Sequence, residues 1–383
     1  MSRPRVLVLN PHFLPGSKGG GSVTAVVSLV AHLKDDFDFV VAASAHDLHT
    51  AEPYSAAACL EAQKKAGVAL HHLPRGLAGL RSMQKLLSQP WDLVYLNSFL
   101  SPVFTALPLL LRRLRRLDLP VLLAPRGELM SGALMQRRAK KLLYLRLLRG
   151  LGMFRGLQFH ATSETERQGL RDFGFAAVHL VADLPPRAQA LPTPRCADES
   201  APLKVVFLSR IEAKKNLLFA LEALAKVTAP VSLDIVGPIG NEAYWDACRE
   251  ATTRLPDWVH TRYLGPVDPE QVVATLAHYE LFLFPTRAEN NGYVIHEALL
   301  AGCSLLISDQ TPWRHLAAAG VGADLPLQVS QFAQAVDAFA ALPAGERLAQ
   351  RQRAQGYGAA RLNAEADIAA MRTLLTQAAS GHR

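Results

Sequence analysis

The feature that most constrains the fold is an alternation of short apolar runs with longer stretches of helical periodicity. Five short runs in the first half of the chain predict strands, at Arg5–Asn10, Phe39–Ala43, Leu93–Asn97, Val121–Ala124 and Leu157–Ala161. Helices are expected between them, for example at Ser22–Leu33 and Ala139–Leu148. Strands that alternate with helices are typical of βαβ units, so we expect a parallel sheet with helices on its faces.

The alternation stops at a proline-rich segment and then starts again. Residues 183–202 contain five prolines and few large apolar residues, which is typical of a linker. After it, strands are predicted at Lys204–Ser209, Val231–Val236, His260–Leu264, Leu281–Pro285 and Ser304–Ile307, and helices at Leu217–Val227, Glu270–His278 and Tyr293–Leu300. We therefore predict two Rossmann-like α/β domains, over residues 1–185 and 203–365. A linker at 186–202 joins them, and a closing helix follows at 366–383.

Composition narrows the classes of partner without choosing one. The 383 residues are enough for two cores, and 41 Lys and Arg against 33 Asp and Glu give a net charge of +8. This balance suits nucleotide phosphates, nucleic acid or an anionic membrane. Aromatic residues are not interleaved with basic ones as in single-strand binders, so we expect no nucleic-acid partner. Four scattered cysteines without a CxxC pair, and no targeting segment before the first strand, favour a cytoplasmic protein.

Two segments bear on contact with a membrane. Residues 93–111 carry no charge and precede the basic segment 112–116 (Arg-Arg-Leu-Arg-Arg), but Asn97, Ser98 and two prolines favour a strand and a buried helix over a membrane span. Residues 136–149 are basic and leucine-rich, although charged and apolar positions do not fall on separate helix faces. Peripheral contact of this helix with an anionic membrane therefore stays open beside a purely solvated helix.

Two junctions between a strand and a helix carry residues suited to an anionic ligand. Glycines at 16 and 19–21 follow the first strand, where they let a backbone approach a ligand at a helix start; the alternative is a flexible turn. Arg210 and Lys215 follow the strand at Lys204–Ser209, where two cations would neutralise a diphosphate. The alternative for them is solvated surface charge.

The most specific feature is a pair of carboxylates eight positions apart. Glu289 lies in a turn rich in Asn and Gly, and Glu297 lies about one turn into the next helix. Glu297 can accept both hydroxyls of a ribose, Glu289 can reach hydroxyls of a sugar, and the N–H groups at the helix start between them favour an anion. Acidic residues that suit the helix dipole are the alternative explanation.

These patterns together resemble the retaining glycosyltransferases of family 4, from Gly19 to Trp313. The segments that carry the resemblance are Gly19–Gly21, Asn97–Ser98, Ala124–Glu128, Ala161–Glu164, Leu208–Arg210, Lys215–Leu217, Phe284–Glu289 with Glu297–Leu299 (the Glu-x7-Glu signature), and Ser308–Trp313. The resemblance implies the GT-B fold, which has two facing Rossmann-like domains with parallel sheets and an active site in the cleft between them.

It also implies a reaction: transfer of a sugar from a UDP- or GDP-sugar to a glycan or lipid-linked glycan, as in surface polysaccharide or lipopolysaccharide synthesis. Arg210 and Lys215 would hold the diphosphate in place of a metal, so no metal or other cofactor is expected. Glu297 would bind the ribose and Glu289 the donor sugar. The remaining donor-binding residues would be Gly20, Gly21, Asn290, Asn291, Gly292, Tyr293 and Val294. Retention would need no nucleophile from the protein.

The sequence departs from the family's usual pattern at three positions. Asn291 stands where many members have an aromatic residue, Tyr293 where many have a His, and Arg126 in a loop where many carry a His. We expect a catalytic role for Arg126, as a contact to an acidic group of the acceptor. His160, at a strand end, is a further candidate to line the cleft.

Other motifs and functions carry less weight. Asp36-Phe37-Asp38 spells the DxD motif of metal-dependent transferases but has no second acidic cluster near it, so a solvated turn is favoured. The scattered histidines show no metal-ligand spacing. Two alternatives to a transferase remain: a nucleotide-sugar epimerase with the GT-B fold, and a protein that binds sugar nucleotides without turnover.

Overall fold

The chain divides into two compact units. The computed structural model describes residues 3–16, 19–48, 50–129, 138–186, 190–195, 201–362 and 364–381. One unit comprises Met1–Arg187 with Ala364–Arg383, and the other Ala188–Asn363. Part of the proline-rich segment belongs to the second unit: Arg351 donates to the carbonyl of Arg195 (2.9 Å) and Gln355 to that of Pro192 (2.6 Å).

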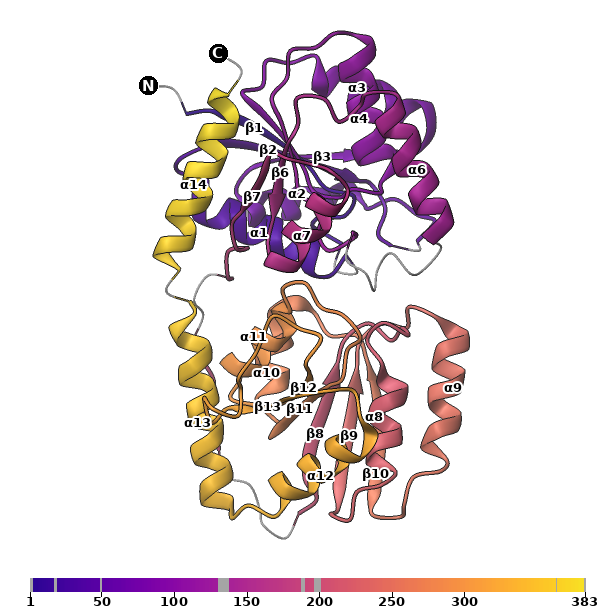
Figure 1. The fold of residues 1–383 in the computed structure, drawn as a ribbon, viewed down its shortest axis with the longest axis vertical. Helices are drawn as coiled ribbons and strands as arrows, with labels where there is room; N and C mark the ends of the chain where they lie inside the picture. The colour runs from indigo at the N-terminus through magenta and orange to yellow at the C-terminus, as the bar shows by residue number, and fades with distance from the viewer. Residues whose placement is uncertain are drawn as a thin grey trace. The chain divides into compact units, whose positions relative to one another are not determined.

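The N-terminal unit is built on a seven-stranded sheet in which every pairing is parallel, in the order β3-β2-β1-β4-β5-β6-β7 (Figure 1). Its strands are β1 (Arg5–Leu9), β2 (Asp38–Ser44), β3 (Ala69–Leu73), β4 (Leu93–Leu96), β5 (Val121–Leu123), β6 (Gln158–Ala161) and β7 (Val178–Leu180). The five strands predicted for this half are confirmed to within one residue at most ends. β3 and β7 were not predicted.

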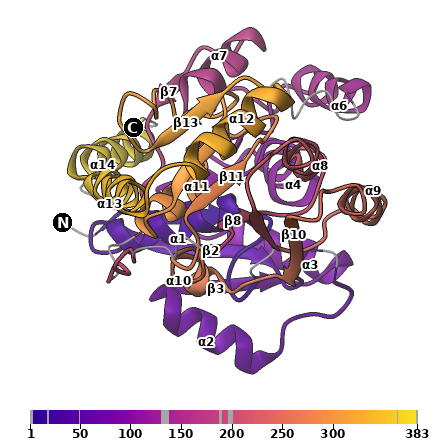
Figure 2. The same cartoon turned by 90° about the horizontal axis from the view of Figure 1, so that it is seen from below.

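Helices cover both faces of this sheet. They are α1 (Gly21–Leu33), α2 (Ala56–Ala66), α3 (Gly76–Leu87), the π-helical η1 (Pro102–Ala106), α4 (Leu107–Leu114), α6 (Arg138–Gly150), α7 (Glu164–Asp172) and α14 (Glu365–Ser380). α1 and α14 share one apolar cluster with the sheet, while α3, α4 and α6 share the other. In Figure 2, α2 lies beside β3 at the sheet edge.

The uncharged residues 93–111 are divided among β4, η1 and the first part of α4, as their polar and proline residues predict. Among the described residues, no helix is both long and apolar enough to cross a membrane. The DxD sequence also has a structural role: Phe37 is buried, Asp38 begins β2, and Asp36 forms an ion pair of 2.9 Å with Arg372 of α14.

The C-terminal unit has a six-stranded sheet, also parallel throughout, in the order β10-β9-β8-β11-β12-β13. Its strands are β8 (Leu203–Leu208), β9 (Val231–Val236), β10 (Val259–Gly265), β11 (Leu281–Phe284), β12 (Ser304–Ser308) and β13 (Gly322–Leu325). Its helices are α8 (Leu217–Leu224), α9 (Glu242–Thr252), the 3-10 helix η2 (Pro269–Gln271), α10 (Val272–Leu276), α11 (Tyr293–Leu300), α12 (Val329–Ala340) and α13 (Ala344–Ala360).

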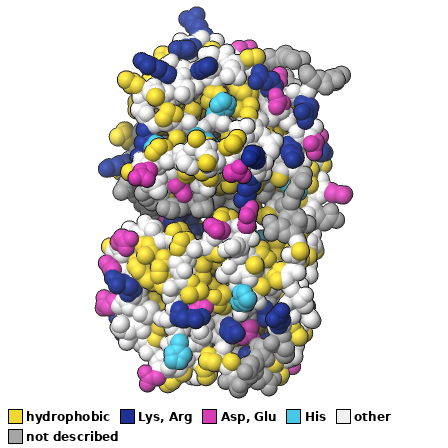
Figure 3. Space-filling view, turned by 180° about the vertical axis from the view of Figure 1, so that it is seen from behind, with side chains coloured by type: hydrophobic (Ala, Val, Ile, Leu, Met, Phe, Trp, Pro, Cys, Tyr) yellow, Lys and Arg dark blue, Asp and Glu magenta, His cyan; other side chains and the backbone are white. Residues whose placement is uncertain are grey.

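The five strands predicted for this half are confirmed, and the helix expected at Glu270–His278 is replaced by the shorter η2 and α10. Large apolar side chains from both faces of the sheet form one core. One face of the molecule in Figure 3 shows hydrophobic side chains gathered in the middle of this unit.

Candidate functional site

In the C-terminal unit, the order of the strands reverses between β8 and β11. Chain connections leave these neighbouring strands in opposite directions, so their carboxyl ends border a crevice in which parallel sheets usually bind ligands. The loop after β8 carries Arg210 and Lys215, and the loop after β11 carries Glu289. The topology therefore brings together residues that lie more than seventy positions apart in the sequence.

Hydrogen bonds tie these two loops into one structure. Asn216 has a left-handed backbone conformation (φ 66°) and is almost fully buried; its side-chain amide donates to the carbonyl of Pro285 (2.9 Å). Arg287 donates to the amide oxygen of Asn216 (3.2 Å), and its own backbone N–H donates to the carbonyl of Lys214 (2.9 Å). Asn tolerates a positive φ better than most residues, so it suits both the turn and the bridge between the loops.

Lys215 and Glu289 form the central ion pair of the site, with 2.5 Å between Nζ and Oε2. Their side chains are only 17% and 15% exposed. Burial alone would raise the pKa of Glu289, but Lys215 and Lys214 outweigh it and hold that pKa below its ordinary value. Glu289 is therefore ionised at neutral pH. The Lys215 ammonium, which also lies 5.3 Å from the centre of the Phe284 ring, is held beside it.

Glu297, on α11, has the opposite electrostatic surroundings. Burial raises its pKa to about 7, and among the described residues no cation or N–H group pairs with its carboxylate. A partly buried carboxylate without a partner weakens the fold. It can accept two hydroxyl donors from a ligand, as a ribose would supply them.

The loop between the two glutamates is held in place by Gly292 and by a hydrogen bond from Trp313. Gly292 caps α11 with a positive φ of 75°, and a Cβ atom there would lie 2.8 Å from Ile295 and 3.1 Å from the Trp313 indole nitrogen. That nitrogen donates to the carbonyl of Asn291 (2.8 Å). The backbone from Asn290 to Val294 is thus fixed where α11 begins, and the first N–H groups of a helix have no partners within the helix.

Arg210 packs against the loop that follows β9. A Cβ atom on Gly240 would lie 2.8 Å from the Arg210 side chain, and one on Gly237 (φ 136°) would lie 2.0 Å from the carbonyl of Ser209. Glycine is therefore required at both positions for the two loops to approach. The Arg210 guanidinium lies 4.0 Å from Glu212 and is 29% exposed, so a ligand can reach it.

In the N-terminal unit, the order of the strands reverses between β1 and β4. Gly20 is the N-cap of α1 with a φ of 64°, and Gly21 is its first residue. Asn10, at the end of β1, donates to the carbonyls of His12 (2.8 Å) and Ser22 (3.2 Å) and so holds the glycine loop. Its amide oxygen is buried without a partner among the described residues. Ser17 and Lys18 lie outside those residues.

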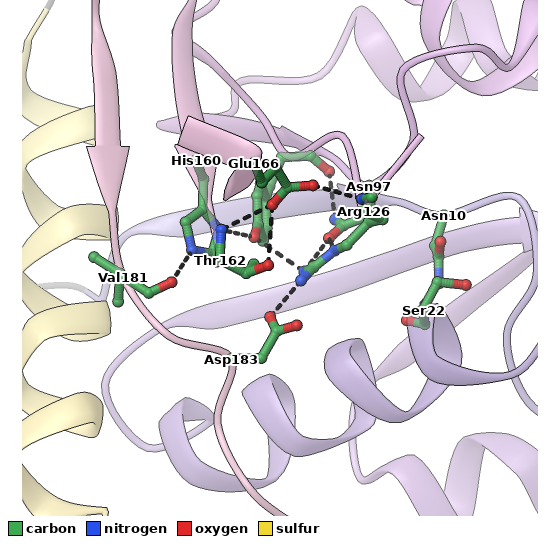
Figure 4. A network of polar contacts seen from close by, with 11 residues as sticks. Asn10, Ser22, Asn97, Arg126, His160, Thr162, Glu166, Val181 and Asp183 are labelled. Carbon is green, nitrogen blue, oxygen red and sulfur yellow. Dashed lines mark hydrogen bonds and ion pairs between the residues drawn. The ribbon is translucent and has the colours of Figure 1, made fainter. Parts of the chain in front are cut away.

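Arg126 follows β5 and lies in a buried polar network (Figure 4). Its guanidinium donates to the Asn97 side-chain oxygen at 3.0 and 2.5 Å, donates to the Tyr95 hydroxyl at 3.1 Å, and forms an ion pair with Asp183. The Arg126 and Asp183 side chains are only 8% and 6% exposed. In this structure Arg126 thus joins the carboxyl ends of β4 and β5 to the segment after β7, and does not project into solvent.

His160 also belongs to this network (Figure 4). Its Nε2 lies 2.8 Å from the carbonyl of Val181 and its Nδ1 lies 2.6 Å from the Tyr95 hydroxyl, so Nε2 carries the proton and Tyr95 donates to Nδ1. Burial, with Arg126 nearby, lowers the pKa of His160 to about 4 and keeps the ring neutral. The ring is fully buried, so in this structure His160, a candidate to line the cleft, supports the ends of the strands and is not exposed to a ligand.

The structure adds site residues that sequence reasoning missed. Asn97 and Trp313 lie in motifs that were recognised, but their roles in holding Arg126 and the donor loop were not predicted. Asp183 was placed at the start of the linker. A charged residue just after a strand end was the available signal for it. Among the described residues, no group of three His, Cys, Asp or Glu side chains could hold a metal ion.

Comparison with known proteins gives the family. The family model "Glycosyl transferases group 1" matches residues 202–341, and the model "Glycosyl transferase 4-like domain" matches residues 19–182, so together they span both units. The chain belongs to the group 1 glycosyltransferases. No protein in the curated set matches it in sequence.

Solved structures show that the fold of this glycosyltransferase is GT-B. HepE of Anabaena, in complex with UDP and glucose, superposes with a TM-score of 0.72 at 15% identity, over 98% of this chain and all of that one. Sucrose-phosphate synthase of Thermosynechococcus elongatus gives 0.69 at 16% identity, over 98% and 99%. WaaG, a glycosyltransferase involved in lipopolysaccharide biosynthesis, gives 0.59 at 13% identity, over 98% and 100%.

Proposed function

We propose that this glycosyltransferase moves a sugar from a nucleoside diphosphate sugar to a glycan or lipid-linked glycan, with retention of anomeric configuration and without a metal ion. The observation that carries the proposal is the grouping of Arg210, Lys215, Glu289 and Glu297 at the β8/β11 reversal point. Two cations and two carboxylates with opposite electrostatic surroundings fit the two ends of such a donor.

Each residue has a distinct role in the proposal. Arg210 and Lys215 hold the diphosphate and stabilise the charge that develops on it as the glycosidic bond breaks. Glu297 accepts the ribose hydroxyls. Glu289, already ionised, accepts hydroxyls of the sugar once Lys215 turns to the phosphate. Backbone N–H groups from Asn290 to Val294 face the phosphates at the start of α11.

The remaining assignments concern the N-terminal unit. Gly20 and Gly21 let the α1 start approach the donor phosphates, since glycine at a positive φ leaves the backbone uncovered. Arg126 acts on the acceptor side. Its burial indicates that it acts by holding the ends of β4 and β5 in place, or that it exchanges Asp183 for an acidic group of the acceptor. Retention proceeds without a protein nucleophile, the leaving phosphate taking the proton of the acceptor hydroxyl.

UDP-sugars are the first donors to test, with GDP-sugars second. HepE is described in complexes with UDP and with UDP-glucose, and the present chain shares its fold. WaaG acts in lipopolysaccharide biosynthesis, which supports a glycan or lipid-linked acceptor in surface polysaccharide assembly. With such an acceptor, the proposal is of a cytoplasmic enzyme that makes peripheral contact with an anionic membrane.

The test is a panel of UDP-, GDP-, ADP- and dTDP-sugars with EDTA present, with thermal shift and slow donor hydrolysis as readouts. We expect one donor to stabilise the protein and to be hydrolysed at an undiminished rate in EDTA. Loss of the response in EDTA would contradict the metal-free mechanism. Stabilisation without hydrolysis or transfer to any acceptor would favour a binding protein, and epimerised donor would favour an epimerase.

A further inference from the structure

The positive charge of the chain is concentrated in one short region. Residues 112–155 contain 12 Lys and Arg against 2 Asp and Glu, a net charge of +10, whereas the whole chain carries +8. The N-terminal unit as a whole has 26 basic against 15 acidic residues, and the C-terminal unit 15 against 18. The unit proposed to bind the anionic donor is therefore not the unit that carries the excess. Donor binding therefore does not explain the excess of positive charge in the N-terminal unit.

Part of this charge surrounds a hollow of about 290 Å³ in the N-terminal unit. The hollow lies between the end of α4 and the turn after α6, and its lining includes Arg112, Arg113, Asp118, Gly152 and Arg155. Both lining segments lead into the amino ends of strands, β5 and β6. The hollow is thus at the sheet edge opposite to Asn97 and Arg126, and is separate from the candidate site.

The arginines converge in the hollow without enough acid to neutralise them. A Cβ atom on Gly152 would lie 3.4 Å from the Arg155 Nε and 3.8 Å from the Arg113 Nε, so these two guanidinium groups flank the same glycine. Within the part of the chain that the structure describes, neither has a hydrogen-bond or ion-pair partner. Arg112 also lines the hollow, and its guanidinium donates to the carbonyls of Leu119 (3.0 Å) and Arg155 (3.1 Å). Converging guanidinium groups repel one another unless an anion lies between them, and a phosphate is the anion that they bind best.

Exposed leucines lie in, or close in sequence to, the two segments that line the hollow. Leu114, next to Arg113, is 69% exposed; Leu151, next to Gly152, is 52% exposed; and Leu147, one turn earlier on α6, is 58% exposed. Leu145 and Leu148 of the same helix are buried. One row of leucines on α6 thus packs into the core, and another is exposed to solvent. Soluble ligands do not require exposed leucines beside an anion site. A membrane surface contacts both phosphates and acyl chains.

We propose that this hollow, which we call the arginine hollow, binds the phosphate of an anionic phospholipid while Leu114, Leu147 and Leu151 enter the acyl boundary. The inference rests on the proposed membrane contact and specifies where that contact is made. Because the hollow is at the amino edge of the sheet, a bound lipid leaves the carboxyl ends of the strands open to substrates. Membrane binding is therefore expected to be independent of the donor.

The test is flotation of the full-length protein with vesicles of phosphatidylcholine, alone or mixed with phosphatidylglycerol. We expect binding only to the mixed vesicles. An Arg113→Gln/Arg155→Gln variant is expected to lose about thirtyfold in partitioning, since each basic residue near an anionic surface contributes about 1 kcal/mol. A Leu114→Gln/Leu151→Gln variant should lose more than about tenfold.

The control is an Arg81→Gln/Arg171→Gln variant, which removes the same charge from exposed sites of the same unit. It should bind within about twofold of the unmodified protein, because those residues lie away from the hollow. Equal losses in the two arginine pairs would show that only diffuse charge matters and would overturn the proposal. Calorimetric binding of inorganic pyrophosphate without any vesicle binding would assign the hollow to soluble phosphates and overturn the lipid assignment.

The UDP thermal shift is measured on the same proteins. We expect it to be unchanged in all three variants, because the substitutions lie in the N-terminal unit, whereas the β8/β11 loops belong to the C-terminal unit. Absence of vesicle binding by the unmodified protein, with an intact UDP response, would refute the hollow and leave the proposed donor standing. An absent UDP response with intact vesicle binding would count against the proposed donor and leave the hollow standing.

Discussion

Glu297 offers the sharpest test, because its proposed role makes the unliganded protein less stable. Burial raises its pKa from 4.5 to about 7. In the unfolded chain the carboxyl ionises at lower pH than in the fold, so the unfolded state binds fewer protons and stability falls as pH rises from about 4.5 to 7. At 1.36 kcal/mol per pKa unit the full penalty above pH 7 is about 3 kcal/mol, and partial exposure of the side chain reduces it to about 2 kcal/mol.

Glu297→Gln keeps the shape of the side chain and removes this penalty. We expect the variant to be more stable than the parent by about 2 kcal/mol at pH 8 and by less than about 1 kcal/mol at pH 5, where the folded carboxyl is mostly protonated. For a unit of this size that corresponds to an increase in Tm of about 4–8 °C at pH 8, measurable by calorimetry. The same variant should lose most of its affinity for the nucleotide donor.

The matched control is Glu222→Gln, which removes one charge from an exposed position on α8 of the same unit. Its stability should stay within about 0.5 kcal/mol of the parent at both pH values. The reasoning is refuted if Glu297→Gln changes Tm by the same amount at pH 5 and pH 8, or if it leaves both Tm and donor affinity unchanged.

Four further predictions concern the ionisation of Glu297 and three other contacts. Lys215→Ala and Glu289→Ala should each lower kcat by at least about a hundredfold in a transfer assay while circular dichroism stays that of the parent; full activity in both would show that the pair is not in the site. Donor binding should weaken as pH falls below 7, because the ribose hydroxyls need ionised Glu297. Calorimetry with an intact UDP-sugar, which has no phosphate titrating in that range, tests this, and affinity independent of pH from 6 to 8 would contradict it. Trp313→Phe removes the hydrogen bond to Asn291 and should raise the donor KM about fivefold without changing the acceptor KM, whereas equal changes in both would argue against a specific effect on the donor loop. Arg126→Ala leaves the buried Asp183 unpaired and should cost about 3 kcal/mol or more in a denaturant titration; a variant as stable as the parent but inactive would instead assign Arg126 to the substrate.

The fold could largely be predicted because its main strands are buried on both faces. Such strands are nearly continuous runs of Val, Leu and Phe, as in Leu281–Phe284, and these runs are visible without any alignment. The three strands that were missed, β3, β7 and β13, lack this signal. β7 has three residues, none of them fully buried, and β13 reads Gly-Ala-Asp-Leu with partial exposure throughout. Both are edge strands, whose position comes from pairing with a neighbour and not from their own composition.

In the candidate site too, the parts formed by adjacent residues could be predicted from the sequence, whereas the parts formed by long-range contacts could not. The loop from Glu289 to Gly292 and the start of α11 are defined by a few adjacent residues, so their chemistry could be predicted from spacing. The Arg126 network joins strand ends that are 29 and 57 positions from Arg126 in sequence. Only the register of β4 to β7 determines that Asn97, Arg126 and Asp183 meet. The sequence therefore indicated an arginine in a ligand loop but not that its charge is already paired.

The two glutamates show why spacing cannot assign electrostatics. Glu289 and Glu297 belong to one motif, yet the first has its pKa lowered and the second has its pKa raised to about 7. The difference comes from Lys214 and Lys215, which belong to another loop and reach Glu289 but not Glu297. A carboxylate that the protein pairs internally adds little cost to the fold, whereas one left without a partner keeps its capacity to accept hydrogen bonds for a ligand. The charge of Glu289 is paired within the protein, whereas that of Glu297 is not. The fold alone therefore gives no reason for a glutamate at position 297, but a bound nucleoside does, because its ribose hydroxyls can donate to the carboxylate.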